Sequence, residues 1–216
     1  MRVLVVEDHD LFVQGYLRMF EMMNAPVQTV DVAKNCKEGR LLLTTKPTKP
    51  YDFIFLDWSI PPDEHANLYN GGDLITPIKA HSPMGKLLVL TSHVEAIFLY
   101  NLYKDFSPDA LICKVDFKVE DFKDVYDAMS GNENYFSQTA RAQIKKISAK
   151  ENYLDNYNRQ IILLLSKGMM TKNLHEVLPL SVSAIDKRKA QIKDYFLLNK
   201  GSDEEIILAA RKEGLI

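Results

Sequence analysis

Five short apolar runs alternate with helix-length amphipathic stretches over the first 130 residues, and this alternation constrains the fold more than any other feature. The runs are Val3–Val6, Val27–Val32, Phe53–Leu56, Leu87–Leu90 and Leu111–Cys113. The stretches are Leu11–Met23, Ala33–Leu43, Asp73–Ala80, Val94–Tyr103 and Val119–Met129. Short, continuous apolar runs are typical of strands that are buried on both faces by covering helices. The pattern predicts an α/β fold with a doubly wound, five-stranded parallel sheet.

A second, all-helical domain is predicted after Gly131. Residues 131–152 include a polar, basic segment, 139–152, and we expect a linker there that is partly helical and separates domains at 1–130 and 153–216. Breakers and caps divide the second domain into four helices. They are a helix from Leu154 ended by Gly168, a short one over Lys172–Leu178 stopped by Pro179, one from Ser181 or Ser183 to about Leu198, and one from Ser202 or Asp203 to Glu213.

The two parts of the chain carry opposite charge. Residues 1–139 have 13 Lys and Arg against 20 Asp and Glu, whereas residues 140–216 have 14 against 9. The basic part is compatible with a polyanionic partner. No apolar run approaches the ~20 residues of a membrane span, and the acidic start is unlike a signal peptide. With two cysteines and no CxxC pair, we expect a cytoplasmic protein without disulfides or membrane contact.

Polar side chains follow four of the five predicted strands. Glu7 and Asp8 come after the first strand, Asp57 ends the third, Thr91 ends the fourth, and Lys114 follows the fifth. Ligands of doubly wound sheets bind at this edge. Clustered carboxylates require a cation, and hard oxygen ligands favour Mg²⁺. An Asp beside Mg²⁺ can accept a phosphoryl group. Each residue alone is more often a cap or a solvated loop residue, but five together predict a phosphoacceptor site.

Residues 2–130 resemble the receiver domain of bacterial two-component response regulators. The resemblance rests on VLVVEDH (3–9), FLDWSIP (55–61), VLTSH (89–93) and Lys114, which stand in the family's order and near its spacing. It implies that Asp57 accepts a phosphoryl group from the phosphohistidine of a histidine kinase. It also implies that Mg²⁺ is held by Glu7, Asp8, Asp57 and the carbonyl group of Ser59, that Thr91 is the switch hydroxyl, and that Lys114 binds the phosphate.

Two departures from the receiver pattern stand out. The loop from Pro61 to Gly72 is several residues longer than in the family, which alters kinase docking or access to the site. Leu111 stands where the family has the aromatic partner of the switch hydroxyl. The second departure puts the usual coupling of Thr91 to an aromatic side chain in doubt, but it leaves phosphorylation itself unaffected.

Residues 154–216 resemble the LuxR/NarL-type helix-turn-helix domain. The matching positions are Leu154, Ile161–Leu165, Gly168, Lys172, Leu174, Leu178, Ser181 and Ile185. The resemblance implies a recognition helix that begins near Val182 and enters the major groove of double-stranded DNA. The basic residues expected to contact DNA are Lys172, Lys187, Arg188, Lys189 and Lys193. Three departures mark the domain as divergent: Asp186 where relatives often carry Lys, Asn158 for Glu, and Pro179 for Gly.

The combined features predict a phosphorylation-controlled transcription regulator that receives its phosphoryl group from a sensor histidine kinase or phosphotransfer protein and dimerises when phosphorylated. One alternative is a receiver whose helical domain docks a protein instead of DNA. Another is a phosphohydrolase of the haloacid-dehalogenase type, which also uses an Asp nucleophile and Mg²⁺. That chemistry requires a second Asp where this chain has Ser59. We therefore expect a phosphoacceptor, with at most self-dephosphorylation, and no enzyme.

Overall fold

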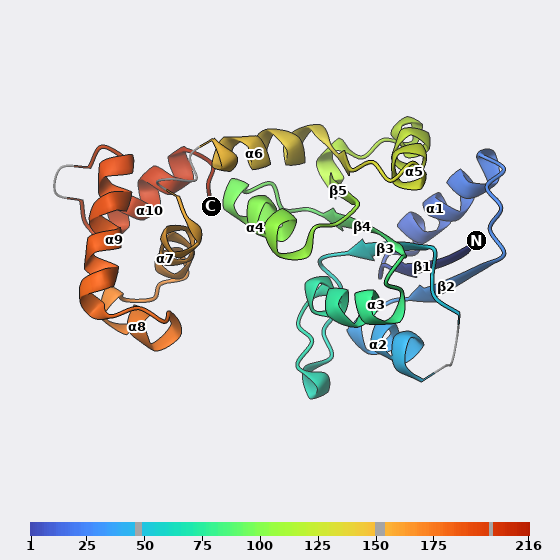
Figure 1. Ribbon diagram of the computed structural model, residues 1–216, viewed down its shortest axis with the longest axis horizontal. Coiled ribbons are helices and arrows are strands. Elements are labelled where there is room, and N and C mark those ends of the chain that lie inside the picture. The colour runs from blue at the N-terminus through green and yellow to red at the C-terminus, as the bar shows by residue number, and fades with distance from the viewer. Residues whose placement is uncertain (46–48, 150–153, 199–200) are drawn as a thin grey trace. The chain divides into compact units, whose positions relative to one another are not determined.

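The computed structural model describes residues 1–45, 49–149, 154–198 and 201–216 (Figure 1). It forms two compact units. The first contains Met1–His93 and Asp105–Ala140, and the second contains Val94–Lys104 and Arg141–Ile216.

A parallel sheet is the centre of the first unit. Its strands lie in the order β2-β1-β3-β4-β5-β6. They are β1 (Arg2–Val6), β2 (Thr29–Ala33), β3 (Phe53–Asp57), β4 (Lys86–Thr91), β5 (Ala110–Cys113) and β6 (Tyr135–Phe136). The predicted doubly wound parallel sheet is confirmed. The sheet has one strand more than expected, because β6 has only two residues and leaves no apolar run in the sequence.

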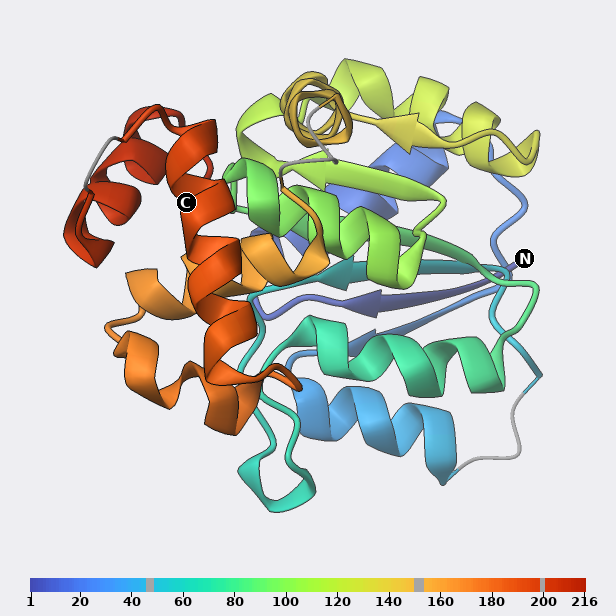
Figure 2. The same ribbon diagram turned by 60° about the vertical axis from the view of Figure 1, so that its left-hand side comes forward.

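Helices cover both faces of this sheet (Figures 1 and 2). On one face lie α1 (Asp10–Met22) and α5 (Phe122–Ser130), and on the other lie α2 (Cys36–Thr44) and α3 (Ile75–His81). Short 3-10 turns complete the unit at Glu64–Ala66, Gly71–Leu74, Lys114–Asp116 and Val119–Asp121. Two of these turns lead into α3 and α5, so the helices predicted over 73–80 and 119–129 each begin with a tighter turn.

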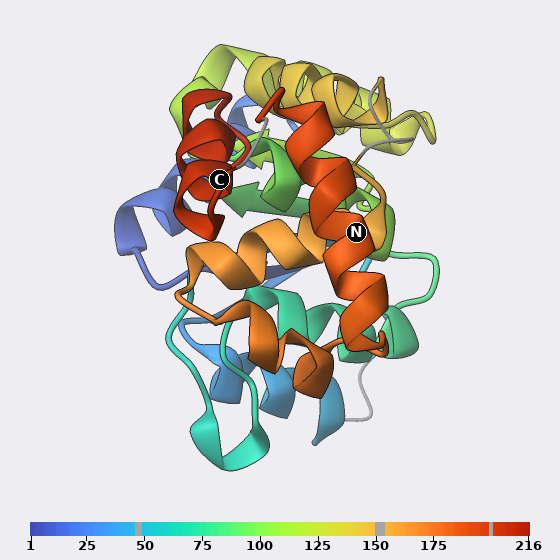
Figure 3. The same ribbon diagram turned by 90° about the vertical axis from the view of Figure 1, so that its left-hand side faces the viewer.

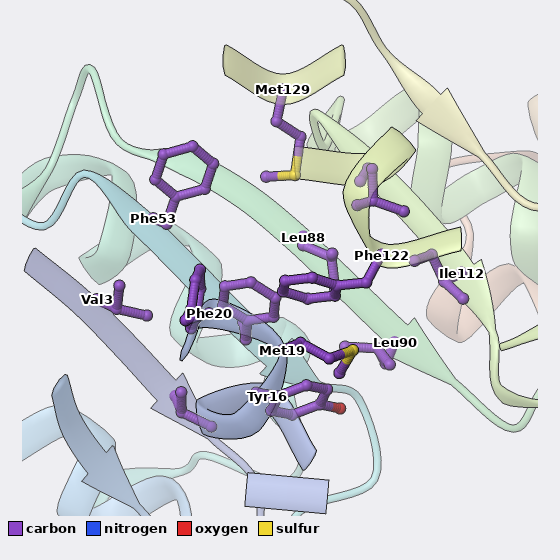
Figure 4. Packing of buried hydrophobic residues seen from close by; sticks show 14 of the residues in the cluster. Val3, Tyr16, Met19, Phe20, Phe53, Leu88, Leu90, Ile112, Phe122 and Met129 are labelled. Carbon is purple, nitrogen blue, oxygen red and sulfur yellow. The ribbon is translucent and has the colours of Figure 1, made fainter. Parts of the chain in front are cut away.

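The core between the sheet and the α1–α5 face is rich in aromatic side chains (Figure 4). Phe55 of β3 lies between Tyr16 and Phe20 of α1, with ring centroids 5.2 Å and 5.5 Å away. Phe122 of α5 stacks on the same Phe55 at 5.8 Å. Full burial of such a side chain contributes about 2–3 kcal/mol. These contacts hold α1 and α5 against β3, the strand that ends in Asp57.

The second unit is helical. It comprises most of α4 (Ala96–Phe106) and of α6 (Gln138–Ser148), together with α7 (Asn156–Ser166), α8 (Leu174–Val177), α9 (Val182–Tyr195) and α10 (Asp203–Lys212). Figure 3 shows α9 beside α7. Side chains cap the helices as the sequence predicts: Ser181, and not Ser183, caps α9, and Ser202 caps α10. Gly168 ends the α7 region with φ +85°, a conformation that favours glycine.

Two further features of the second unit bear on the predictions. The segment expected as a partly helical linker forms α6, where Ala140, Ile144 and Ile147 are buried at helical spacing. At the start of α4, the N–H groups of Ala96 and Ile97 donate to the carbonyl oxygens of Gly214 and Leu215 at 3.3 Å and 3.1 Å. Among the described residues, no helix combines the length and the apolarity that a membrane crossing demands.

Candidate functional site

The predicted acidic residues converge at the carboxyl end of the sheet because β1 and β3 are adjacent and in register. Val6 pairs with Leu56, so the next residues, Glu7 and Asp57, leave the sheet side by side. Both side chains are almost fully buried, with residue exposures of 1% and 2%. Two buried carboxylates side by side repel each other unless a cation lies close to both.

Lys114 supplies that cation. It follows β5, and its Nζ atom lies 2.9 Å from Asp57 Oδ2 and 3.4 Å from Glu7 Oε2. The Nζ atom also lies 4.6 Å from the centre of the Phe12 ring, a cation–π contact. Burial lowers the pKa of the Lys114 ammonium, but its bonds to Asp57 and Glu7 raise it by more, so the net pKa is raised. Lys114 therefore stays charged.

The pKa of the Glu7 carboxyl group is raised. Burial raises its pKa, and the neighbouring Asp57 carboxylate raises it further. Hydrogen bonding from His9 and the charge of Lys114 act in the opposite direction but do not cancel these effects. His9 contributes its backbone N–H, 3.1 Å from Glu7 Oε1, and its ring Nδ1, 3.0 Å from the same oxygen. One oxygen of Glu7 thus faces His9, and the other faces Lys114.

The donor set suits a hard divalent cation. Ligand atoms from Glu7, Asp8, His9 and Asp57 all lie within 4.8 Å of one another. The Oδ1 atom of Asp8 is shielded from solvent and accepts no hydrogen bond within the described part of the chain, although His9 Nδ1 lies 2.9 Å away. A shielded carboxylate oxygen without a hydrogen bond fits a metal ligand. Three carboxylates at one edge match the oxygen coordination that Mg²⁺ prefers.

The remaining predicted residues of the site lie close to this cluster in the chain. The backbone N–H of Ser59 lies 3.3 Å from Asp57 Oδ1, and the side chain of Ser59 is exposed. Thr91 at the end of β4 is fully buried, and its hydroxyl accepts a hydrogen bond from the N–H of His93 at 3.1 Å. Thr91 pairs with Cys113, the residue before Lys114. Both expected phosphate-binding groups therefore lie at the ends of adjacent strands.

The long loop over residues 61–72 is anchored at both ends. Asp63 is buried and forms an ion pair with Arg40 of α2 at 3.1 Å. A β-bridge joins Asp63 to Leu68 across the loop. At the far end of the loop, a Cβ atom on Gly71 would lie 2.1 Å from the carbonyl oxygen of Asp57. The loop therefore passes so close to the backbone of Asp57 that only glycine fits at position 71.

We expect Lys114→Ala to lower the free energy of unfolding by about 3 kcal/mol when Mg²⁺ is chelated, because Glu7 and Asp57 would keep buried charges without a counter-ion. Added Mg²⁺ should recover more stability in the variant than in the wild type. Urea unfolding with EDTA and with Mg²⁺ measures both effects. Lys118→Ala, which removes an exposed lysine four residues away, is the matched control. Equal unfolding midpoints for Lys114→Ala and Lys118→Ala would contradict the role of Lys114.

The predicted DNA-contacting residues of the helical unit fall into two groups. Lys172 and Lys187 are exposed, and Lys193 is partly buried. Arg188 and Lys189 instead pair with acidic residues of the same unit. Arg188 contacts Asp155 at 2.6 Å, and Lys189 contacts Asp203 at 2.5 Å. The KRK run therefore presents Lys187 to solvent and directs its other two cations toward α7 and α10.

Asp155 both caps α7 and pairs with α9. Its carboxylate accepts from the N–H of Asn158 at 2.9 Å and from Arg188. Burial raises the pKa of Asp155, but the bonds from Arg188 and the Asn158 N–H lower it by more, so the net pKa is lowered. The carboxylate form is thus favoured in the folded chain, and its stabilising effect is present above the ordinary pKa and is lost as the pH falls through the lowered one.

Asp155→Ala should lower the free energy of unfolding by about 1–2 kcal/mol at pH 7, the usual contribution of an N-cap residue. The difference in free energy of unfolding between variant and wild type should shrink as the pH falls below 3.8, the ordinary pKa of an Asp side chain, because protonation of Asp155 removes the same charge from the wild type. Denaturant unfolding between pH 7 and pH 3 tests this. Asp186→Ala, at an exposed position of α9, serves as control and should change stability by less than about 0.5 kcal/mol.

Comparison with known proteins finds full-length similarity at low sequence identity. No family model matches the chain. Two curated proteins, both named oxygen regulatory protein NreC and from two strains of Staphylococcus epidermidis, are 22% identical over 227 residues, covering 100% of this chain and 99% of each relative. A structure of RcsB from Salmonella enterica serovar Typhimurium, bound to promoter P1flhDC with the phosphomimetic BeF₃⁻, matches with 20% identity and a TM-score of 0.64 over 97% of both chains. A structure of two RcsB dimers bound to two parallel DNAs gives the same identity and TM-score over 98% of both chains. The two RcsB structures confirm the predicted fold over 97–98% of the chain.

Proposed function

We propose that this chain, whose fold matches that of the two-component response regulator RcsB, takes a phosphoryl group on Asp57 and controls transcription by binding double-stranded DNA. The observation that carries the proposal is the contact of Lys114 with both Asp57 and Glu7 at the strand ends, in a chain that also contains a helical unit in which α8 is followed by α9. The proposed domains are a receiver at 1–130 and a DNA-binding domain at 153–216. The phosphodonor would be a histidine kinase or a phosphotransfer protein.

The chemistry of the site follows from its charges. A carboxylate oxygen of Asp57 attacks the phosphorus of a phosphohistidine, and a P–O bond forms as the P–N bond breaks. The electron pair of the P–N bond returns to the histidine ring, which is protonated on its other nitrogen and leaves as neutral imidazole. Lys114, already bound to Asp57 Oδ2, is positioned to bind an oxygen of the incoming group. Glu7, Asp8, Asp57 and the carbonyl group of Ser59 would hold Mg²⁺, which neutralises charge on the transferring phosphoryl group.

A phosphoacceptor is favoured over a phosphohydrolase by the residue at position 59. The hydrolase needs the carboxylate of an Asp there to activate water, and a serine hydroxyl cannot act as that base. We also place the protein in the cytoplasm, in keeping with its two cysteines, Cys36 and Cys113, which are both buried and form no disulfide.

DNA binding is favoured over protein docking because RcsB, which shares this fold over 97–98% of the chain, is bound to DNA in the matching structures. On α9, the exposed residues near the N-terminus are Val182, Ser183, Asp186 and Lys187. We propose that Lys172, Lys187 and Lys193 contact phosphates. Arg188 and Lys189 would reach DNA only by leaving Asp155 and Asp203, so base readout from these two residues requires that their ion pairs open.

Binding to genomic DNA fragments should be salt-dependent and should depend on Lys187. Lys187→Ala is expected to weaken binding to all fragments by a similar factor and to reduce the slope of log K against log salt by about 1, because one phosphate contact is lost. Electrophoretic mobility shift at several salt concentrations measures both quantities. Lys37→Ala, an exposed lysine of α2, should behave as wild type. DNA binding that is absent or independent of salt would favour the protein-docking alternative.

A further inference from the structure

Tyr16 of α1 has a hydroxyl group that the fold leaves unsatisfied. The residue is only 1% exposed, and its OH is buried and forms no hydrogen bond within the described part of the chain. Its ring is held tightly, 5.2 Å from Phe55, 6.4 Å from Phe12 and 6.2 Å from Phe117. A phenylalanine would make the same ring contacts without burying an unpaired polar group.

The geometry directs this hydroxyl toward the carboxylate cluster. Phe55, on which the Tyr16 ring packs, precedes Asp57 by two residues, so their side chains lie on the same face of β3. Helix α1 runs back from the strand ends, and helical side chains lean toward the N-terminus of their helix. Figure 4 shows the hydroxyl oxygen of Tyr16 on the side of the ring toward which the strand arrowheads point. The hydroxyl therefore lies on the face of β3 that carries Asp57, on the side of the ring nearer the strand ends.

The electrostatic environment agrees with this placement. Burial raises the pKa of the Tyr16 hydroxyl, and the carboxylates of Glu7 and Asp57 raise it further. The hydroxyl accordingly keeps its proton and acts as a neutral hydrogen-bond donor next to two buried acids.

Lys114 is the only cation among the described residues for which a contact with both of these acids is found. If it moves onto a phosphoryl oxygen, Glu7 Oε1 keeps its contacts with His9, but Glu7 Oε2 loses its hydrogen-bond donor and is left with at most Mg²⁺ as a partner. Carboxylates that bind a metal ion are themselves held in position by hydrogen bonds. A buried carboxylate oxygen without a donor is costly. Tyr16 provides a hydrogen-bond donor on the face of the sheet on which the side chain of Asp57 lies.

We propose that Tyr16 is a positioning residue of the phosphoacceptor site, whose hydroxyl donates to Glu7, directly or through one buried water, when Lys114 leaves Glu7 for the phosphoryl group. This inference rests on the proposed function. It assigns to an otherwise unpaired core hydroxyl the task of holding Glu7 in place in the phosphorylated state.

Titration of Tyr16→Phe with BeF₃⁻ in saturating Mg²⁺ tests the proposal, with the fluorescence of Trp58, the single tryptophan of the chain and the neighbour of Asp57, as readout. The variant should need about tenfold more BeF₃⁻ than the wild type, the effect of losing one hydrogen bond to a charged group. The thermal midpoint of the free variant should equal or exceed that of the wild type, because no hydrogen bond is lost there. Tyr126→Phe removes a hydroxyl from the same core, near Phe53 at the other end of β3, and should titrate as wild type. Equal BeF₃⁻ affinity of Tyr16→Phe and wild type would overturn the proposal, whatever the stability of the variant.

A double-mutant cycle separates this inference from the proposed function. In a Lys114→Ala background, Glu7 needs a new donor even in the free protein, so adding Tyr16→Phe should lower the thermal midpoint, although it does not do so in the wild-type background. Additive effects of the two substitutions would overturn the proposal. A wild type that neither binds BeF₃⁻ nor accepts phosphate would instead count against the proposed function, and the cycle would still report on Tyr16.

Discussion

Incubation of the protein with Mg²⁺ and acetyl phosphate is expected to place one acid-labile phosphoryl group on Asp57, and Asp57→Asn is expected to abolish the labelling. The carboxylate of Asp57 is the nucleophile, and an amide at the same position has no negative charge with which to attack phosphorus. Lys114 lies 2.9 Å from the reacting carboxylate and would bind the product. Mass spectrometry of the intact protein counts the added groups, and peptide mapping locates them.

The controls for this experiment come from neighbouring carboxylates. Asp10→Asn changes an exposed acid at the start of α1 and should label like the wild type. Asp8→Ala removes one oxygen ligand from the cluster and should lose most of the labelling together with its Mg²⁺ dependence, as chelation of Mg²⁺ does in the wild type. Undiminished labelling of Asp57→Asn would show that another residue is the acceptor.

Phosphorylation should raise both the dimer fraction and the affinity for DNA. The phosphoryl group adds about two negative charges at the end of β3, toward which Thr91 and Lys114 can move. In this structure the Thr91 hydroxyl accepts from the N–H of His93, so its movement would rearrange the loop that leads into α4. Two helix-turn-helix units in one dimer reach two half-sites together, and such linkage increases affinity by at least about tenfold.

Sedimentation velocity and DNA titration, each with and without BeF₃⁻, measure these two effects. Thr91→Ala should still bind BeF₃⁻ while failing to shift toward dimer or toward tighter DNA binding. Leu111 is fully buried at the position where receivers carry an aromatic side chain, so the coupling rests on Thr91 without that partner. Identical sedimentation and identical DNA affinity in both states would leave Asp57 as a phosphate acceptor without a switch.

The convergence of Glu7, Asp57 and Lys114 could be predicted from sequence because strand ends are easy to locate. Each of these residues ends or follows a short apolar run, and in a parallel sheet all such ends lie at one edge. The apolar runs likewise predicted the sheet, and capping chemistry narrowed the N-caps of α9 and α10 to two candidates each, of which Ser181 and Ser202 cap the helices. Periodicity and local capping chemistry depend on neighbours in the chain, which the sequence displays directly.

The partners of Arg188 and Lys189 could not be predicted in this way. Asp155 lies 33 positions before Arg188, and Asp203 lies 14 positions after Lys189, and nothing in a basic run shows which distant acids it meets. The unpaired hydroxyl of Tyr16 was hidden for a similar reason, since its position in an apolar helix face is equally suited to phenylalanine. Both features arise only when helices pack.

The strand order also determines when the phosphoacceptor edge can form during synthesis. Val3 of β1 pairs with Phe53 of β3, fifty positions later. Strand β1 therefore cannot pair with β3 until the ribosome has released more than fifty residues. At about 5–20 residues per second, several seconds separate the appearance of Glu7 from that of its partner Lys114. Long-range pairing of this kind slows folding relative to local contacts. The helical unit has a long-range pairing of its own, because Ala96 and Ile97 at the start of α4 bond to Gly214 and Leu215, so it too is completed only after these last residues have been made.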